Sequence, residues 1–186
     1  MVRRHGLDPF FRSVLKLKSV KRAGWVSKVK VESAESVADH SFAMCAVAML
    51  FSDMLGLDTS RVMKMVVLHD LAESVVGDYI PGAVPSAEKV SLEKKAMQGI
   101  LASLPAKARS EYAEIWAEYL GNRTRAARFV HRIDKFEMAL QAGDYAMRGY
   151  DKSLLAQFFR SAKAEIEDGT NDIVTRTFRQ ITSDHL

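Results

Sequence analysis

The sequence Val66-Val67-Leu68-His69-Asp70-Leu71-Ala72-Glu73 carries an apolar run directly into an adjacent His-Asp pair. Successive helix positions differ by about 100°, so an ion between His69 and Asp70 is within reach of both side chains. Glu73 follows His69 by four residues and shares its helical face. Burying three such groups is costly unless a cation or hydrogen-bond partners satisfy them. The stretch indicates either a metal site or an ordinary helix-surface pair.

The helices that flank this stretch bring in a second histidine. The His-Asp pair lies in a helix that we expect over residues 58–77, with a capping Asp or Thr at its start. Upstream, Ser36 and Asp39 are spaced as a capping box, which predicts a helix over residues 36–55. His40 lies in the first turns of that helix and is expected to face inward. Its simplest role is a hydrogen-bonded core histidine, and a ligand role stays open.

A further acidic group, Asp134, lies in an amphipathic segment late in the chain. On a helical wheel it falls beside Val130 and Ile133, so we expect it to face the core. A buried aspartate requires a cation or several hydrogen-bond donors. The segment around Asp134 is therefore the third part of the chain that offers a possible metal ligand.

The remaining periodicity is helical throughout. Gly- and Pro-rich residues 78–85 indicate a loop, as does the break at residues 21–25. Residues 26–31 alternate too weakly to predict a strand. Further helices are expected at residues 8–20, 86–103, 105–120, 122–148, 151–167 and 170–182. Without a convincing strand signal, the predicted fold class is all-α.

Composition indicates a single globular domain over residues 1–186. The chain is 48% apolar and 27% charged, the balance of an ordinary globular domain. The lone cysteine, Cys45, excludes an internal disulfide and is typical of a reducing compartment. The apolar run at residues 42–51 is too short to span a bilayer, and the N-terminal residues lead into no signal-type apolar core. We therefore expect a cytoplasmic protein without a membrane partner.

Positive charge is concentrated in residues 1–30, which hold nine Lys or Arg and one acidic residue, Asp8. The net charge of this segment is +8, and that of the remainder is −4. A basic segment can attract nucleic acid, an acidic membrane surface or a phosphate-bearing small ligand. It can equally be a solvated helix face, so the charge alone does not identify a partner.

Taken together, these residues resemble the HD-domain metal-dependent phosphohydrolases. His40, His69-Asp70 and Asp134 match the H…HD…D signature of that superfamily. Their neighbourhoods resemble its 5′-deoxynucleotidase branch in order and spacing from about residue 14 to about residue 150, at residues 22–25, 35–40, 69–73, 77–78 and 134–138. The helices expected over residues 151–182 carry no motif of the family.

The resemblance implies an HD-domain helical bundle that hydrolyses the 5′-phosphate of 2′-deoxynucleoside monophosphates. It assigns four ligands to one divalent ion: His40, His69, Asp70 and Asp134. Two imidazoles and two carboxylates suit Mn²⁺, Co²⁺, Fe²⁺, Ni²⁺ or Zn²⁺, and the sequence does not choose among them. Two-metal members of the superfamily use extra histidines; His131 is expected to lie near the site or at the surface instead.

The same resemblance assigns catalytic and substrate-binding roles to four more residues. Glu73 is the expected general base toward water or general acid toward the leaving 5′-oxygen. Asp78 matches an aspartate that shares proton transfer or holds the sugar, although a plain turn aspartate competes with that role. Arg22 is expected to bind phosphate oxygens. Trp25 is expected to contact the sugar or base and exclude a 2′-hydroxyl, with core packing as the alternative.

Two other classes of function remain as alternatives. One is another HD phosphohydrolase: a nucleoside triphosphate triphosphohydrolase, a guanosine tetraphosphate hydrolase or a cyclic-nucleotide phosphodiesterase. The chain is short, it has few histidines, and Ser74 rather than an aspartate follows Glu73, all of which count against them. The other is a non-catalytic nucleotide- or nucleic-acid-binding module. It would have no need of Glu73, so we expect no nucleic-acid partner. A homodimer is expected because the family commonly forms dimers.

Overall fold

The computed structural model describes residues 6–80, 82–167 and 170–183, and every regular element within them is helical. This confirms the predicted all-α class. The α-helices are α1 (Asp8–Lys16), α2 (Val37–Met54), α3 (Thr59–His69), α4 (Glu73–Val76), α5 (Ser86–Leu101), α6 (Ala106–Gly121), α7 (Arg125–Met147), α8 (Lys152–Ile166) and α9 (Ile173–Thr182).

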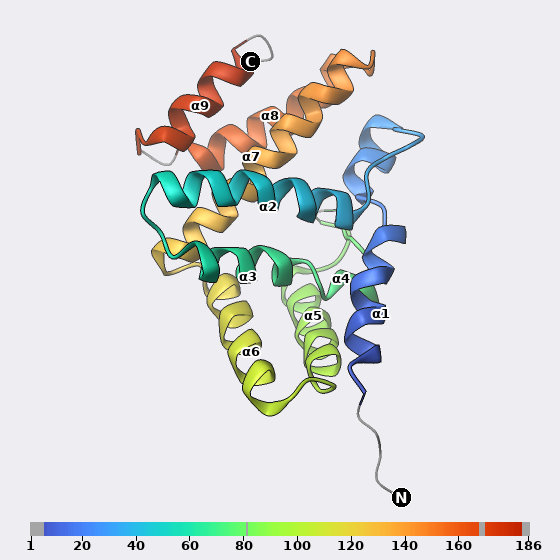
Figure 1. The fold of residues 1–186 in the computed structure, drawn as a ribbon. Helices are drawn as coiled ribbons and strands as arrows, with labels where there is room; N and C mark the ends of the chain where they lie inside the picture. The colour runs from blue at the N-terminus through green and yellow to red at the C-terminus, as the bar shows by residue number, and fades with distance from the viewer. Residues whose placement is uncertain (1–5, 81, 168–169, 184–186) are drawn as a thin grey trace, which may run out of the picture.

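The bundle is built around α7. This helix packs against α2, α3, α6, α8 and α9, and its buried residues include Ile133 and Phe136. In Figure 1, α2 and α3 cross the middle of the molecule, α8 and α9 lie above them, and α5 and α6 lie below. The four predicted metal ligands therefore lie on, or directly after, three helices that pack on one another: α2, α3 and α7.

The start of α2 is the capping box that the sequence predicts. The Ser36 hydroxyl accepts a hydrogen bond from the Asp39 N–H at 3.1 Å, and the Asp39 carboxylate accepts one from the Ser36 N–H at 2.8 Å. These bonds satisfy backbone donors that the first helical turn leaves unpaired. The cap thereby determines where α2 begins, and His40 follows in the first turn, fully buried.

The prediction of one continuous helix over residues 58–77 is wrong. Asp58 caps α3 as expected, but α3 ends at His69. The N–H groups of Leu71, Glu73 and Ser74 each donate to a carbonyl three residues earlier, so the chain tightens into turns before α4. This tightening moves Asp70 and Glu73 off the spacing of an ideal helix. Apolar periodicity continues through the break, which is why the sequence does not reveal it.

The predicted loop at residues 21–25 is only partly correct. The chain is helical from residue 23, and Trp25–Val29 form a single π-helical turn. Lys30 then adopts a left-handed conformation with φ of 61°. An isolated antiparallel bridge between Lys21 and Ser36 joins this segment to the start of α2. The bridge brings the segment containing Arg22 and Trp25 close to His40.

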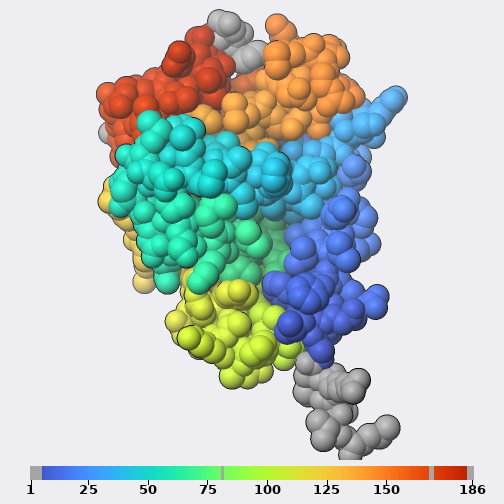
Figure 2. Space-filling view, in the orientation of Figure 1, coloured from blue at the N-terminus to red at the C-terminus, as the bar shows by residue number. Residues whose placement is uncertain are grey.

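Helix α2 also forms part of the molecular surface, crossing the face shown in Figure 2 without another element over it. Its exposed large apolar residues are Phe42, Met49, Leu50 and Met54. Among the residues that the structure describes, no helix combines the length and apolar character needed to cross a bilayer.

Candidate metal centre

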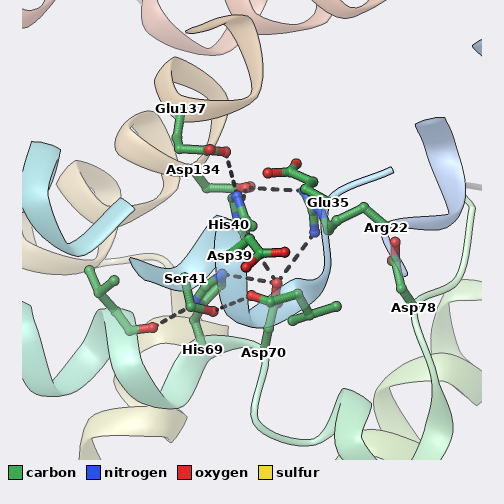
Figure 3. Close-up of polar contacts among 12 residues, drawn as sticks. Arg22, Glu35, Asp39, His40, Ser41, His69, Asp70, Asp78, Asp134 and Glu137 are labelled. Atoms are coloured by element: carbon green, nitrogen blue, oxygen red, sulfur yellow. Dashed lines mark hydrogen bonds and ion pairs between the residues drawn. The ribbon is translucent and has the colours of Figure 1, made fainter. Parts of the chain in front are cut away.

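The structure brings the four predicted metal ligands together (Figure 3). One ligand atom each of His40, His69 and Asp134 lies within 4.8 Å of the other two. Asp70 Oδ2 is 3.0 Å from His69 Nε2 and 3.9 Å from His40 Nε2. Asp134 Oδ1 is 3.3 Å from His40 Nε2. Residues separated by as many as 94 positions in the chain thus surround one point.

The donor atoms at this point fit a divalent cation. Nε2 of His40 and Nε2 of His69 are buried without a hydrogen-bond partner among the described residues. Each ring uses its other nitrogen within the protein: His69 Nδ1 lies 2.6 Å from the Val66 carbonyl oxygen, and His40 Nδ1 lies 2.5 Å from Glu137 Oε2. A ring whose Nδ1–H donates in this way presents Nε2 as the ligand. Two such nitrogens beside two carboxylates suit a first-row divalent ion.

The charges of the cluster are strongly coupled. Burial and Arg22 lower the pKa of His40, but its bonds to Asp134 and Glu137 outweigh them and raise this pKa to about 9. Burial raises the pKa of Asp70, but His69 and Arg22 outweigh it and hold this pKa well below its usual range. A cation would therefore replace a proton on His40 and meet carboxylates that are already ionised.

The Arg22 guanidinium lies beside both acidic ligands. Its Nη1 is 3.4 Å from Asp70 Oδ2, and its Nη2 is 3.8 Å from Asp134 Oδ1. The Arg22 side chain is 16% exposed and lines a cavity beside the ligands. A guanidinium in this position can bind an anionic group that enters next to the metal point.

The cavity has a volume of about 380 Å³, within the range of small-molecule sites, roughly 300–1,000 Å³. Its wall combines acidic and basic groups with aromatic rings. The acidic groups include Asp70, Glu73, Asp78 and Asp134, and the basic groups are Arg22, Lys28, Lys89 and Lys135. The three lysines of this wall were not predicted from the sequence, and only Lys28 of the three falls within the basic segment at residues 1–30.

Glu73 faces this cavity from the first residue of α4. It is 4% exposed, and its Oε2 has no hydrogen-bond partner among the described residues. Burial and the negative charges of Asp70 and Asp78 raise the pKa of Glu73 to about 10. In the metal-free protein Glu73 is therefore a neutral carboxyl group at neutral pH, able to donate a proton.

Asp78 lines the same cavity but also has a structural contact. Its Oδ2 accepts a hydrogen bond from the backbone N–H of Ala23 at 2.7 Å. This bond joins the segment after α4 to the segment that carries Arg22. Asp78 is thus placed where both its predicted catalytic role and the alternative structural role are possible.

Trp25 is almost completely buried. It is 2% exposed, its ring lies 4.1 Å from the Phe158 ring and 5.2 Å from the Tyr145 ring between centroids, and its Nε1–H donates to Glu35 Oε1 at 2.8 Å. The side chain still lines the cavity. Most of the ring is therefore core, and what remains for a substrate is a rigid portion of the wall.

Two groups that contact the histidine ligands were not predicted from the sequence. Glu137, 2% exposed, lies against His40, and its signal was its position one helical turn after Asp134. Tyr119 packs edge-on against His69 at 5.7 Å and stacks on His131 at 4.2 Å between centroids. His131 Nε2 lies 3.0 Å from the Tyr119 carbonyl oxygen, so His131 lines the cavity from behind the ligands.

Curated relatives cover most of the chain. The 5′-deoxynucleotidase HDDC2 of Mus musculus is 41% identical over 141 residues, covering 75% of this chain and 70% of that protein. The proteins of the same name from Homo sapiens and Dictyostelium discoideum are 38% and 36% identical, covering 82% and 84% of this chain and 74% and 87% of theirs.

Solved structures share the fold. A conserved hypothetical protein of Pyrococcus furiosus superposes with a TM-score of 0.75 at 28% identity, covering 95% of this chain and 96% of its own. A predicted metal-dependent phosphohydrolase of Magnetospirillum magnetotacticum superposes with a TM-score of 0.70 at 22% identity, covering 95% of this chain and 91% of its own. The HD domain family model matches residues 14–174. This chain therefore belongs to the HD domain family.

Proposed function

We propose that this protein is a divalent-metal-dependent 5′-deoxynucleotidase, which removes phosphate from 2′-deoxynucleoside monophosphates. The observation that carries the proposal is the pair of unpartnered, buried Nε2 atoms facing Asp70 and Asp134 beside the cavity. The relatives that bear this name support the choice of reaction. The set of residues involved is small enough to test one at a time.

The metal is held by His40, His69, Asp70 and Asp134. When bound there, a divalent ion polarises a phosphoryl oxygen and lowers the pKa of a coordinated water. Mixed nitrogen and oxygen donors suit Mn²⁺, Co²⁺, Fe²⁺, Ni²⁺ and Zn²⁺. Adding single metal ions to metal-stripped protein tests which of them supports activity.

Arg22 binds the phosphate group of the substrate. It already lies beside both carboxylate ligands, so a phosphate entering next to them meets its N–H groups. Lys135 Nζ, 2.9 Å from Asp134 Oδ2, and Lys89, which also lines the cavity, add positive charge around it. These three cations offset the negative charge that an anionic nucleotide brings into an acidic site.

Glu73 acts as the general acid toward the leaving 5′-oxygen. A carboxyl group kept neutral by burial can give its proton to the alkoxide that forms as the phosphate ester breaks. Asp78 positions the Arg22 segment through Ala23 and contacts the deoxyribose from the cavity wall. Proton transfer thus rests with Glu73, and orientation rests with Asp78.

Trp25 selects deoxyribose over ribose. Its ring is fixed between Tyr145 and Phe158, so the portion of the wall that it forms cannot retreat to admit an extra hydroxyl. Trp25 contacts the substrate through van der Waals contact, because its one side-chain N–H already donates to Glu35.

The test is phosphate release from deoxy- and ribonucleoside mono-, di- and triphosphates and cyclic nucleotides by metal-stripped protein with added Mn²⁺, Co²⁺, Zn²⁺ or Mg²⁺. We expect metal-dependent release from deoxymonophosphates and little from ribonucleotides. Activity confined to triphosphates or cyclic nucleotides would assign the protein to another branch of the family. No release from any nucleotide by the metal-loaded protein would contradict an enzymatic role.

We further propose that the protein is a cytoplasmic homodimer. The exposed apolar residues of α2, with Phe42 78% exposed and Leu50 57% exposed, support burial of this helix against a second copy. Size-exclusion chromatography with light scattering measures the mass directly. Phe42→Glu is expected to give a monomer, and an unchanged mass would exclude this surface as the interface.

A further inference from the structure

A second cluster lies beside His40 and consists of a half-buried and a buried acidic residue, Glu35 and Glu137. The ligand-type atoms of Glu35, His40 and Glu137 all lie within 4.8 Å of one another. Glu137 Oε2 contacts His40 Nδ1 at 2.5 Å, and Glu35 Oε1 accepts the Nε1–H of Trp25 at 2.8 Å. Figure 3 shows Glu137 and Glu35 on either side of His40. Polar groups therefore lead from Trp25 on the cavity wall through Glu35 and Glu137 to His40, a predicted metal ligand.

The backbone of Glu35 anchors this path to the segment that carries the substrate-binding residues. Its carbonyl accepts the N–H of Arg22 at 3.1 Å, and its own N–H donates to the Tyr145 hydroxyl at 3.0 Å. Tyr145 also packs edge-on against Trp25. Glu35 is thus held at both backbone groups, and its side chain is held by the Nε1–H of Trp25.

The His40 ring has a side-chain partner outside the ligand cluster, because its Nδ1 lies 2.5 Å from Glu137 Oε2. Its ring is fully buried, and Glu137 is 2% exposed. An acidic partner on Nδ1 keeps the proton on that nitrogen, directs Nε2 toward the metal and raises the basicity of the ligand. Glu35 places a ligand-type atom within 4.8 Å of those of both Glu137 and His40, so a change at Glu35 acts on both residues.

We propose that Glu35 and Glu137 are positioning residues that connect Trp25 with His40, so that the arrangement of the cavity wall contributes to metal affinity. The inference rests on the proposed metal centre and is independent of which nucleotide is the substrate. It assigns to Trp25 an influence on metal binding although the Trp25 side chain carries no metal-ligating atom.

The first test measures Mn²⁺ affinity of metal-stripped protein by calorimetry. Loss of an outer partner of a metal-bound histidine typically weakens metal affinity by about 10- to 100-fold. We expect Glu137→Gln, which keeps an acceptor oxygen, near the lower figure and Glu137→Ala near the upper. Glu118→Gln is the matched control, because Glu118 pairs with Arg61 outside the cavity, and its Mn²⁺ affinity should stay within about twofold of wild type.

The second test is a double-mutant cycle between Trp25→Phe and Glu137→Gln. Phenylalanine keeps a ring but removes the N–H that Glu35 accepts, so we expect metal affinity to fall several-fold without a change in the ligands. In the double variant the losses should be less than multiplicative, since connected residues act on the same ligand. A loss that equals the product of the two single losses would overturn the connection.

Folding and the metal centre are checked separately. Circular dichroism melting curves identify any variant that fails to fold, and Glu137→Gln, nearly equal in volume to the native residue, keeps the test available if Glu137→Ala unfolds. Wild-type protein that binds no divalent ion would overturn the metal centre and the inference together. Wild-type binding with unchanged affinity in folded Glu137→Gln and Trp25→Phe would overturn this inference alone.

Discussion

Each histidine of the metal centre divides its two ring nitrogens between the protein and the ligand point. His69 uses Nδ1 on the Val66 carbonyl, and its own carbonyl lies 3.4 Å from the Nε1–H of Trp116. The residue is therefore held through side chain and backbone alike. Each histidine thus keeps one ring nitrogen available for a metal ion. Removing one of these side chains is expected to reduce metal binding while the protein still folds.

His69→Ala should lose most of the bound metal, because it removes one of two imidazole ligands and the direct neighbour of Asp70. Metal content after dialysis, measured by mass spectrometry, checks this expectation. Arg109→Ala is the control, since Arg109 is exposed on α6 and does not line the cavity. Full metal occupancy in His69→Ala would contradict the assignment of this ligand.

Glu73→Ala should keep the metal and the fold but lose at least about 100-fold in kcat, the lower range for a positioned acid or base. The expectation follows from a buried carboxyl group whose Oε2 has no partner beside the ligands. Steady-state phosphate release measures kcat, and the metal analysis above shows that the site is intact. Glu88→Ala, on an exposed position of α5, serves as the control; equal turnover in both variants would exclude Glu73 from proton transfer.

The sequence predicted the four candidate ligands but not the residues that contact them. His40, His69, Asp70 and Asp134 match a signature that can be read along the chain. The contact of Glu137 with His40 joins α7 to α2 across 97 positions, and it exists only because these helices pack together. No spacing rule reports such a contact.

At the scale of secondary-structure elements, helix ends place the functional groups. The start of α2 positions His40, and the end of α3 positions His69 and Asp70. The capping box of α2 was readable from Ser36 and Asp39 because it is local. The end of α3 was not, since it depends on backbone hydrogen bonds that a continuing apolar pattern conceals.

Ser36→Ala should lower the free energy of unfolding by about 1 kcal/mol, the typical effect of losing an N-cap side chain. The Ser36 hydroxyl is buried and bonds both the N–H and the carboxylate of Asp39. Urea denaturation followed by circular dichroism measures the change. Ser91→Ala, on an exposed position of α5, should change the free energy of unfolding little. An equal loss in both variants would mean that the Ser36 cap does not stabilise the fold specifically.

Asp172→Asn should weaken the attachment of α9 to α7. Asp172 accepts two hydrogen bonds from the buried Arg132 guanidinium, at 2.7 and 2.9 Å, and caps α9 through the Thr175 N–H. Asparagine also caps helices well, so the variant isolates the charge. We expect a loss of about 1 to 2 kcal/mol in free energy of unfolding near neutral pH, because Asp172 is partly exposed while Arg132 is buried.

The pH dependence of this loss has a definite sign. The hydrogen bonds from Arg132 lower the pKa of Asp172 to about 2, from an ordinary value of 3.8. A lowered pKa in the folded state means that the stabilisation is complete above about pH 4 and is lost as the pH falls toward 2. The difference in unfolding free energy between wild type and Asp172→Asn should shrink across that window. A difference independent of pH from 2 to 6 would contradict the ion pair.

At the scale of the whole molecule, the metal centre joins α2, the end of α3 and α7, which lie in the middle of the bundle in Figure 1. The family, the all-α class and the order of helices followed from the sequence, since helical periodicity and the signature extend over most of the chain. The depth of the cavity and its three lysines did not, because Lys28, Lys89 and Lys135 meet only when distant segments pack.

Metal binding should therefore stabilise the entire bundle. At a free Mn²⁺ concentration of 100 times Kd, binding to the folded state alone adds about 2.7 kcal/mol, which for a chain of this size raises Tm by roughly 5 to 10 °C. Thermal melts with Mn²⁺ and with a chelator measure the shift. His69→Ala should show almost none, and an equal shift in that variant would mean that the ion stabilises the protein from another site.

The wide separation of the ligands in the sequence also has a consequence for biosynthesis. A chain leaving the ribosome presents His40 and the His-Asp pair long before Asp134 has been made. Domains generally fold as units, and this centre cannot close until most of the chain has emerged. Loading with metal is thus a late event, and a truncated or stalled product of translation would leave two histidines exposed to whichever ion is most abundant.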